Sequence, residues 1–162
     1  NACARLVASL RVPAGDAVSS CRVVPSRFSR SLPGVIPMSK PLRILFVEDQ
    51  ADLRELMSDV FVQMGMEVVT LADAAAALEL LAEGPQVDVL FTDVYMPGQM
   101  SGAELSMRVA QRWPQVRIVL ASGHARHQLP ELPPGVQFIQ KPYSLQQAAR
   151  LIRGEAPSIQ AA

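Results

Sequence analysis

From residue 42 onward, short apolar runs alternate with longer segments in which apolar residues recur every three or four positions. The short runs predict buried β-strands, and the longer segments predict amphipathic helices. Strands that alternate with helices indicate a doubly wound α/β fold, a five-stranded parallel sheet with helices on both faces. Strands are expected at residues 42–47, 67–70, 87–91, 116–120 and 136–139, and helices at residues 51–64, 74–82, 102–112 and 144–153.

Local signals support several of these boundaries. Asp73 and Ser144 stand where an N-cap is expected, and Gly65 follows the first helix as a C-terminal glycine. The connection between the last two strands differs from the others, because it contains Pro130 and the pair Pro133-Pro134. Proline lacks a backbone N–H and interrupts a regular helix. We therefore expect the helix in this connection, the fourth of five in a regular alternation of strands and helices, to be short or absent.

The first 37 residues carry no comparable pattern. Pro13, Pro25, Pro33 and Pro37 interrupt them, and small polar residues fill the gaps. We expect a disordered basic leader or linker at residues 1–40, one folded domain at residues 41–154 and a flexible tail at residues 155–162. The leader is rich in Arg and poor in acids, so a targeting segment is an alternative, as is a start assigned too far upstream of Met38.

Charge divides the chain in the same place. The 162 residues carry 15 basic and 15 acidic side chains, so the net charge is zero. Residues 1–37 contain five Arg and one Asp, a balance of +4, and the rest of the chain has a balance of −4. Neither the zero net charge of the whole chain nor the charge of −4 on residues 38–162 favours nucleic-acid binding by the folded part. Its apolar runs are too short to span a membrane, and it lacks cysteine, which fits a cytoplasmic protein.

Acidic residues follow two of the expected strands. Glu48 and Asp49 end the first strand, and Asp93 ends the third. Ligands of open α/β sheets bind at the carboxyl ends of the strands, so these acids are expected to converge there. Each acid taken singly is also compatible with a cap or turn role. Together they suit Mg²⁺, and Ser122 and Lys141 at the ends of the next strands complete a phosphoryl-transfer site.

At these residues the chain resembles the receiver domain of bacterial two-component response regulators. The loop Met96-Pro97-Gly98 with Gly102, and Lys141-Pro142 after the last strand, also match that family. The resemblance covers residues 43–152, about two-thirds of the chain. It implies a flavodoxin-like, receiver-type sheet with strand order 2-1-3-4-5.

The resemblance also implies roles for the residues of the site. Asp93 is expected to be the phosphoacceptor, and Lys141 to pair with a phosphoryl oxygen. Asp49 is expected to bind Mg²⁺ directly and Glu48 through water. The backbone carbonyl of Tyr95 and the Asp93 carboxylate complete the expected metal set.

Further expectations concern switching and access to the site. Ser122 is expected to be the switch hydroxyl, and Phe138 stands at the family's aromatic switch position, with a plain core Phe as the alternative. The peptide bond before Pro142 is expected to be cis. We hypothesise that His124, together with Tyr95, alters how readily water attacks the phosphorylated aspartate.

The implied partner is a histidine kinase or a histidine phosphotransfer protein. The downstream target and the oligomeric state stay open. Leu132-Pro133-Pro134-Gly135 is similar to the turn found in receivers of hybrid histidine kinases.

Two other functions compete with the phosphoacceptor. One is a receiver-like binding module that is never phosphorylated. The other is a Mg²⁺-dependent hydrolase of the haloacid dehalogenase type, which needs an acid where Tyr95 stands. We therefore expect a phosphoacceptor rather than an enzyme.

Overall fold

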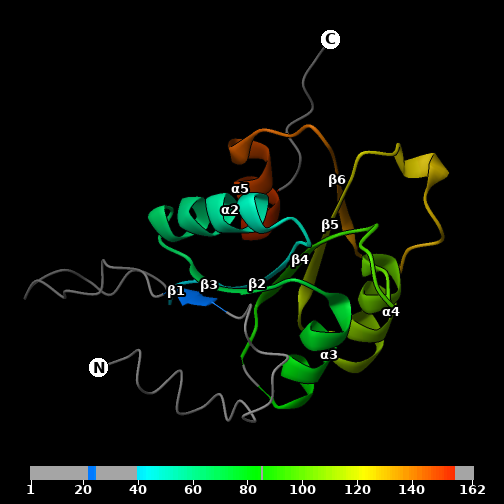
Figure 1. Ribbon diagram of the computed structural model, residues 1–162, viewed down its shortest axis with the longest axis horizontal. Helices are drawn as coiled ribbons and strands as arrows, with labels where there is room; N and C mark the ends of the chain where they lie inside the picture. The colour runs from blue at the N-terminus through cyan, green and yellow to red at the C-terminus, as the bar shows by residue number, and fades with distance from the viewer. Residues whose placement is uncertain (1–21, 25–39, 85, 156–162) are drawn as a thin grey trace, which may run out of the picture.

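The computed structural model describes residues 22–24, 40–84 and 86–155. Five parallel strands run side by side in the order β3-β2-β4-β5-β6 (Figure 1). Numbered along the folded domain, this order is 2-1-3-4-5, so the predicted α/β fold is confirmed. The parallel strands are β2 (Arg43–Val47), β3 (Glu67–Leu71), β4 (Val89–Asp93), β5 (Arg117–Ser122) and β6 (Gln137–Gln140).

A sixth strand, β1 (Arg22–Val24), pairs antiparallel with β3 at one edge of the sheet. For these three residues the expectation of an unstructured leader is wrong. Two consecutive valines favour extended backbone, and the edge of β3 offers unpaired N–H and C=O groups. The other residues of the expected leader, except Lys40, lie outside the described residues, as do all residues of the expected tail except Glu155.

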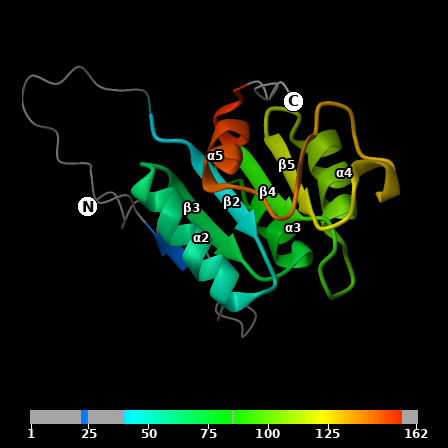
Figure 2. The same cartoon turned by 90° about the horizontal axis from the view of Figure 1, so that it is seen from above.

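Helices cover both faces of the sheet. In Figures 1 and 2, α2 and α5 lie on one face, and α3 and α4 lie on the other. The strand side chains alternate between the two faces and form two buried clusters, one under each helix pair. The four helices are α2 (Ala51–Gln63), α3 (Ala74–Ala82), α4 (Gly102–Arg112) and α5 (Leu145–Arg153).

The expected helix signals act as capping groups. Asp73 accepts a hydrogen bond from the N–H of Ala76 (2.8 Å), and Ser144 accepts one from the N–H of Gln147 (3.2 Å). Gly65 follows α2 with a φ of 84°, in the left-handed region that glycine enters without steric cost. These local choices fix where three of the four helices start or stop.

The connection between β5 and β6 contains only one short 3₁₀ turn, η2 (Arg126–Gln128). The expectation that the fourth helix, the one in this connection, is short or absent is therefore confirmed. Leu132 is buried against the cluster under α3 and α4, where it covers apolar surface that a longer helix would otherwise cover. Figure 1 shows this segment projecting beyond the end of the sheet.

Aromatic rings fill the cluster under α2 and α5. The centroids of Phe46, Phe61 and Phe91 lie 5.4–5.8 Å apart, and Tyr143 lies 6.0 Å from Phe91. Aromatic pairs at this spacing add stability beyond the area that they bury. Because Phe91 stands two residues before Asp93, this packing supports the end of β4.

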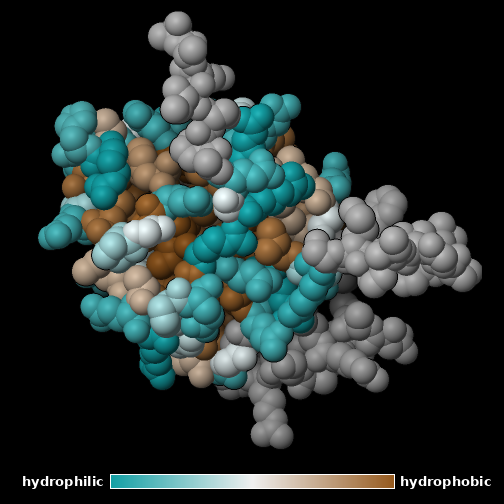
Figure 3. Space-filling view, turned by 180° about the vertical axis from the view of Figure 1, so that it is seen from behind, coloured by the Kyte–Doolittle hydropathy of each residue, from teal (hydrophilic) through white to brown (hydrophobic). Residues whose placement is uncertain are grey.

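The described surface also carries apolar residues. Viewed from behind, hydrophobic residues gather near the middle of one face, surrounded by hydrophilic ones (Figure 3). The large apolar side chains that are exposed among the described residues are Leu56 on α2, Tyr95 on the β4–α4 loop, Met107 on α4 and Leu145 on α5. No helix among the described residues is long and apolar enough to cross a bilayer.

Candidate functional site

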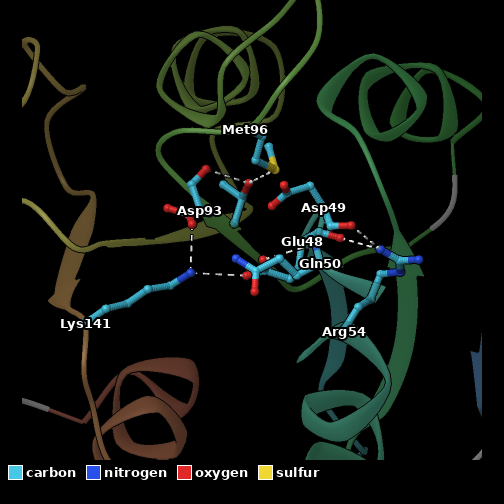
Figure 4. Close-up of polar contacts among 8 residues, drawn as sticks. Glu48, Asp49, Gln50, Arg54, Asp93, Met96 and Lys141 are labelled. Carbon is cyan, nitrogen blue, oxygen red and sulfur yellow. Dashed lines mark hydrogen bonds and ion pairs between the residues drawn. The ribbon is translucent and has the colours of Figure 1, made fainter. Parts of the chain in front are cut away.

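The carboxyl ends of four strands meet at one edge of the sheet, and most of the expected site residues stand there. Val47 of β2 pairs in register with Thr92 of β4, which places Glu48 beside Asp93. The carboxyl end of β6 leads into Lys141, whose side chain reaches back towards both acids (Figure 4).

Lys141 joins two acids that are far apart in the sequence. Its Nζ lies 2.7 Å from Oδ2 of Asp93 and 3.3 Å from Oε2 of Glu48. The Glu48 side chain is 2% exposed and the Asp93 side chain 13%, so the three charges interact with little screening by water. The structure thus brings together three of the residues that the sequence singled out.

Burial and charge act in opposite directions on these groups. Burial raises the pKa of Glu48, and the charge and hydrogen bond of Lys141 offset only part of that rise. Burial also pushes the pKa of Lys141 down, but its hydrogen bond and ion pair with Asp93, and its attraction to Glu48, give a net upward shift of that pKa. Lys141 is therefore a firmly protonated cation in a pocket of acids.

One oxygen of Asp93 has no partner. Oδ2 accepts from Lys141, whereas Oδ1 is buried and forms no hydrogen bond. A buried carboxylate oxygen without a donor is costly, and a cation can satisfy it. The Asp49 side chain, which is half-buried, lies on the Asp93 side of its loop (Figure 4).

These donors fit Mg²⁺, although the side chains alone do not form a closed metal site. Within the described part of the chain, no three His, Cys, Asp or Glu side chains are grouped closely enough to hold a metal ion. Mg²⁺ in proteins usually takes one or two carboxylates and keeps several waters, so it needs no such cage. The unpartnered oxygen of Asp93 and the neighbouring Asp49 supply donors of that type.

Ser122 and Phe138 stand on β5 and β6, the two strands that follow β4 on one side of the sheet. Ser122 is fully buried, its Oγ accepts from the N–H of His124 (3.1 Å), and its carbonyl accepts from the N–H of Lys141 (2.7 Å). Phe138 is half-buried on β6, opposite Leu120, and belongs to neither buried cluster. It is therefore less enclosed than a core Phe. The peptide bond between Lys141 and Pro142 is cis, as expected.

Tyr95 and His124 come from different loops and contact each other. Their ring centroids lie 5.0 Å apart in an edge-on arrangement, and Tyr95 is 48% exposed. The β4–α4 loop supplies Tyr95, and the loop after Ser122 supplies His124. Two residues that the sequence linked only by a hypothesis are therefore in direct contact.

The sequence did not identify the role of Arg54. Its Nη1 donates to the carbonyl oxygen of Glu48 (2.6 Å) and to that of Asp49 (3.2 Å). The available signal was weak: Arg54 stands in the first turns of the helix that follows the acids, so its long side chain could reach back over them.

Gly102 matched the family loop, but its physical role emerges only from the structure. It begins α4 with its Cα against the backbone of Asp93, and its N–H donates to the carbonyl of Val94 (3.0 Å). A Cβ at this position would overlap the carbonyl oxygen of Asp93. Glycine is thus required for α4 to approach the end of β4 this closely.

Known proteins resemble this arrangement. The family model described as "Response regulator receiver domain" matches residues 44–153. CpdR, a response regulator receiver protein of Brucella abortus, is 32% identical over 106 residues, which cover 64% of this chain and 87% of CpdR. The chain spans only 17–26% of the length of several other curated relatives.

Solved structures agree with this match. The receiver domain of the hybrid histidine kinase CckA is 29% identical, with a TM-score of 0.58 and coverage of 69% of this chain and 96% of that domain. TrrA of Thermotoga maritima, solved with Mg²⁺ and BeF, has a TM-score of 0.63 at 22% identity, with coverage of 70% and 97%. At that identity TrrA shows a shared fold.

Replacing Gly102 with Ala is expected to lower the free energy of unfolding by about 1–3 kcal/mol, the usual cost of an overpacked site. The reason is the overlap with the Asp93 carbonyl, which the backbone can relieve only by moving. Urea unfolding measures the change. Gly123→Ala is the matched control, because a Cβ there meets nothing within 4 Å. Equal stabilities of the two variants contradict the steric argument.

Replacing Glu48 with Gln is expected to stabilise the metal-free protein at pH 7. The raised pKa of Glu48 means that the native state binds more protons than the unfolded state between the ordinary and the raised pKa. Stability from this group therefore falls as the pH rises through that window. The advantage of the variant should shrink as the pH is lowered through the raised pKa towards the ordinary value.

Urea unfolding in EDTA at pH 7 and pH 5 tests this expectation. Glu131→Gln, at an exposed loop position, controls for the loss of one negative charge. A Glu48→Gln protein that is less stable than the wild type at pH 7 contradicts it.

Proposed function

This chain belongs to the response regulator receiver domain family, and on that basis we propose that it accepts a phosphoryl group on Asp93 in a two-component phosphorelay. The observation that carries the proposal is the contact of Lys141 with Asp93 and Glu48 at the carboxyl edge of the sheet. This contact holds a carboxylate nucleophile and a cation side by side in a half-buried pocket, where charge neutralisation is most effective.

The proposed step is a direct transfer. An oxygen of the Asp93 carboxylate attacks the phosphorus of a phosphohistidine, an O–P bond forms, the P–N bond breaks, and the histidine nitrogen keeps the bonding electrons. Oδ1 is the oxygen without a hydrogen-bond partner, so it is free to engage phosphorus or the cation. The Lys141 ammonium then stabilises negative charge on the transferred group.

Mg²⁺ is the proposed cofactor. Asp49, Asp93 and the backbone carbonyl of Tyr95 would hold the ion, with Glu48 acting through water, and the ion would supply positive charge for the phosphoryl oxygens. The structure of TrrA with Mg²⁺ and BeF supports this assignment by analogy of fold. The bound ion would also give the buried Oδ1 of Asp93 a partner.

The proposed output is a change of protein-contact surface rather than turnover of a substrate. Phosphorylation adds about −1.5 to −2 charges. The Ser122 hydroxyl moves to the phosphoryl group and gives up its bond with the N–H of His124, and Phe138 at the edge of the sheet follows this movement. The protein is thus a phosphoacceptor that assists its own phosphorylation and dephosphorylation, not an enzyme in the usual sense.

The proposed phosphodonor is a histidine kinase or a histidine phosphotransfer protein in the cytoplasm. TrrA has been solved in complex with the histidine kinase ThkA, which supports this class of partner. The similarity to the CckA receiver, together with the turn before β6, supports a place in a phosphorelay of the hybrid-kinase type.

Incubation with acetyl phosphate and Mg²⁺ is expected to add one base-labile phosphoryl group, detected by intact mass. Asp93→Asn removes the nucleophilic carboxylate and should abolish labelling, and EDTA should suppress it. Asp88→Asn is a matched control. Oδ2 of Asp88 accepts a hydrogen bond from the N–H of Arg43 (2.8 Å) at the start of β2, at the opposite end of the strand from the site.

Absence of label under any condition favours a binding module that is not phosphorylated. Sustained release of phosphate from a phosphomonoester favours a hydrolase. Either result overturns the proposal.

Tyr95→Ala and His124→Ala are each expected to shorten the lifetime of the phosphorylated protein by a few-fold. Their rings contact each other beside the pocket and shield it from water, and an aromatic contact contributes about 0.5–1.5 kcal/mol. Decay of the label in EDTA gives the lifetime. His127→Ala is the control, because His127 is exposed on η2. Unchanged lifetimes in both variants rule out shielding.

A further inference from the structure

We propose that Arg54 is a positioning residue for the cation site: it holds the two peptide planes that flank Asp49, and so fixes the direction in which the Asp49 side chain leaves the backbone. The inference rests on the proposed function, because it concerns binding of Mg²⁺ at that site. It assigns a role to a side chain that belongs to α2 and is not itself a ligand.

The geometry is specific to one nitrogen. Nη1 of Arg54 donates to the carbonyl of Glu48 (2.6 Å) and to that of Asp49 (3.2 Å), as Figure 4 shows. The first carbonyl lies in the peptide plane before Asp49 and the second in the plane after it. Because peptide units are planar, fixing both carbonyls restricts φ and ψ of Asp49. Those two angles set the direction of the Cα–Cβ bond, from which the carboxylate extends.

Few other contacts hold the loop between β2 and α2. The N–H of Glu48 donates to the carbonyl of Leu71 on β3 (3.1 Å), which anchors the start of the loop. At the other end, the N-cap residue of α2 is Gln50, whose side chain makes no capping hydrogen bond. The N–H of Gln50 instead donates to Oε1 of Glu48 at 3.4 Å, a long bond. The N–H of Arg54 donates to the carbonyl of Gln50 (2.9 Å), which is the first hydrogen bond of the helix. Beyond that bond, the guanidinium supplies the short contacts that tie Glu48 and Asp49 to the helix.

The charge of Arg54 acts against its proposed effect on the metal. A cation beside a Mg²⁺ site disfavours binding of the ion by Coulomb repulsion. Removing that charge alone should tighten Mg²⁺ binding, whereas loss of the loop anchor should weaken it. The two explanations predict changes of opposite sign, so the sign of the change distinguishes them.

Titration calorimetry of the unphosphorylated protein with MgCl₂ provides the test. Arg54→Met keeps the apolar stem and removes the donors and the charge. It is expected to raise the Kd for Mg²⁺ roughly tenfold, which is the smallest loss of affinity usually seen when a residue that positions a metal ligand is replaced. Arg54→Lys keeps the charge on a shorter arm without the planar fork, and it is expected to give an intermediate Kd. Arg153→Met, in the last turn of α5, is the matched control and should leave the Kd unchanged.

The outcomes separate this inference from the proposed function. A wild-type protein that binds no Mg²⁺ overturns both. A wild-type protein that binds Mg²⁺, with an equal or lower Kd in Arg54→Met, overturns only the positioning role. Thermal unfolding of each variant identifies a loss of fold. If Arg54→Met does not fold, the Kd of Arg54→Lys decides: a higher value supports the role, and an unchanged value contradicts it.

Discussion

The burial of carboxylates at one edge of the sheet is the constraint on which the rest of the site depends. Parallel register brings Glu48 beside Asp93, and burial raises the pKa of Glu48, so its charge is costly. Lys141, which directly follows β6, offsets part of this cost through its ion pairs with both acids. The aromatic packing behind Phe91 and the close approach of Gly102 then hold the end of β4, where Asp93 stands, in place. The site therefore depends on the packing around it as well as on its own ion pairs.

Much of the fold follows from local sequence patterns. Each of the five parallel strands is a short apolar run, and Asp73 and Ser144 cap helices where their positions indicate. The position of the acids was equally predictable, because a residue that directly follows a parallel strand must stand at the carboxyl edge of the sheet. The lack of a regular helix between β5 and β6 was predictable from the three prolines of that connection.

Other features depend on distances that no local pattern encodes. The contacts of Arg54 require its side chain to cross from a helix to a loop, and the role of Gly102 depends on how closely two backbones pack. The contact of Tyr95 with His124 joins two loops whose lengths alone do not fix their paths. Strand β1 was missed because three residues within a proline-rich segment carry too little periodicity to indicate a strand.

That added strand has a consequence for how the molecule behaves at high concentration. Open sheet edges can pair with other chains and lead to aggregation. Three residues of β1 occupy the outer hydrogen-bonding positions beside Val68, Val69 and Thr70, so the chain fills part of this edge with its own upstream sequence. A shorter version of the domain that begins after β1 exposes a β-branched edge strand. Its colloidal stability, rather than its fold, is the property that such a truncation would change first.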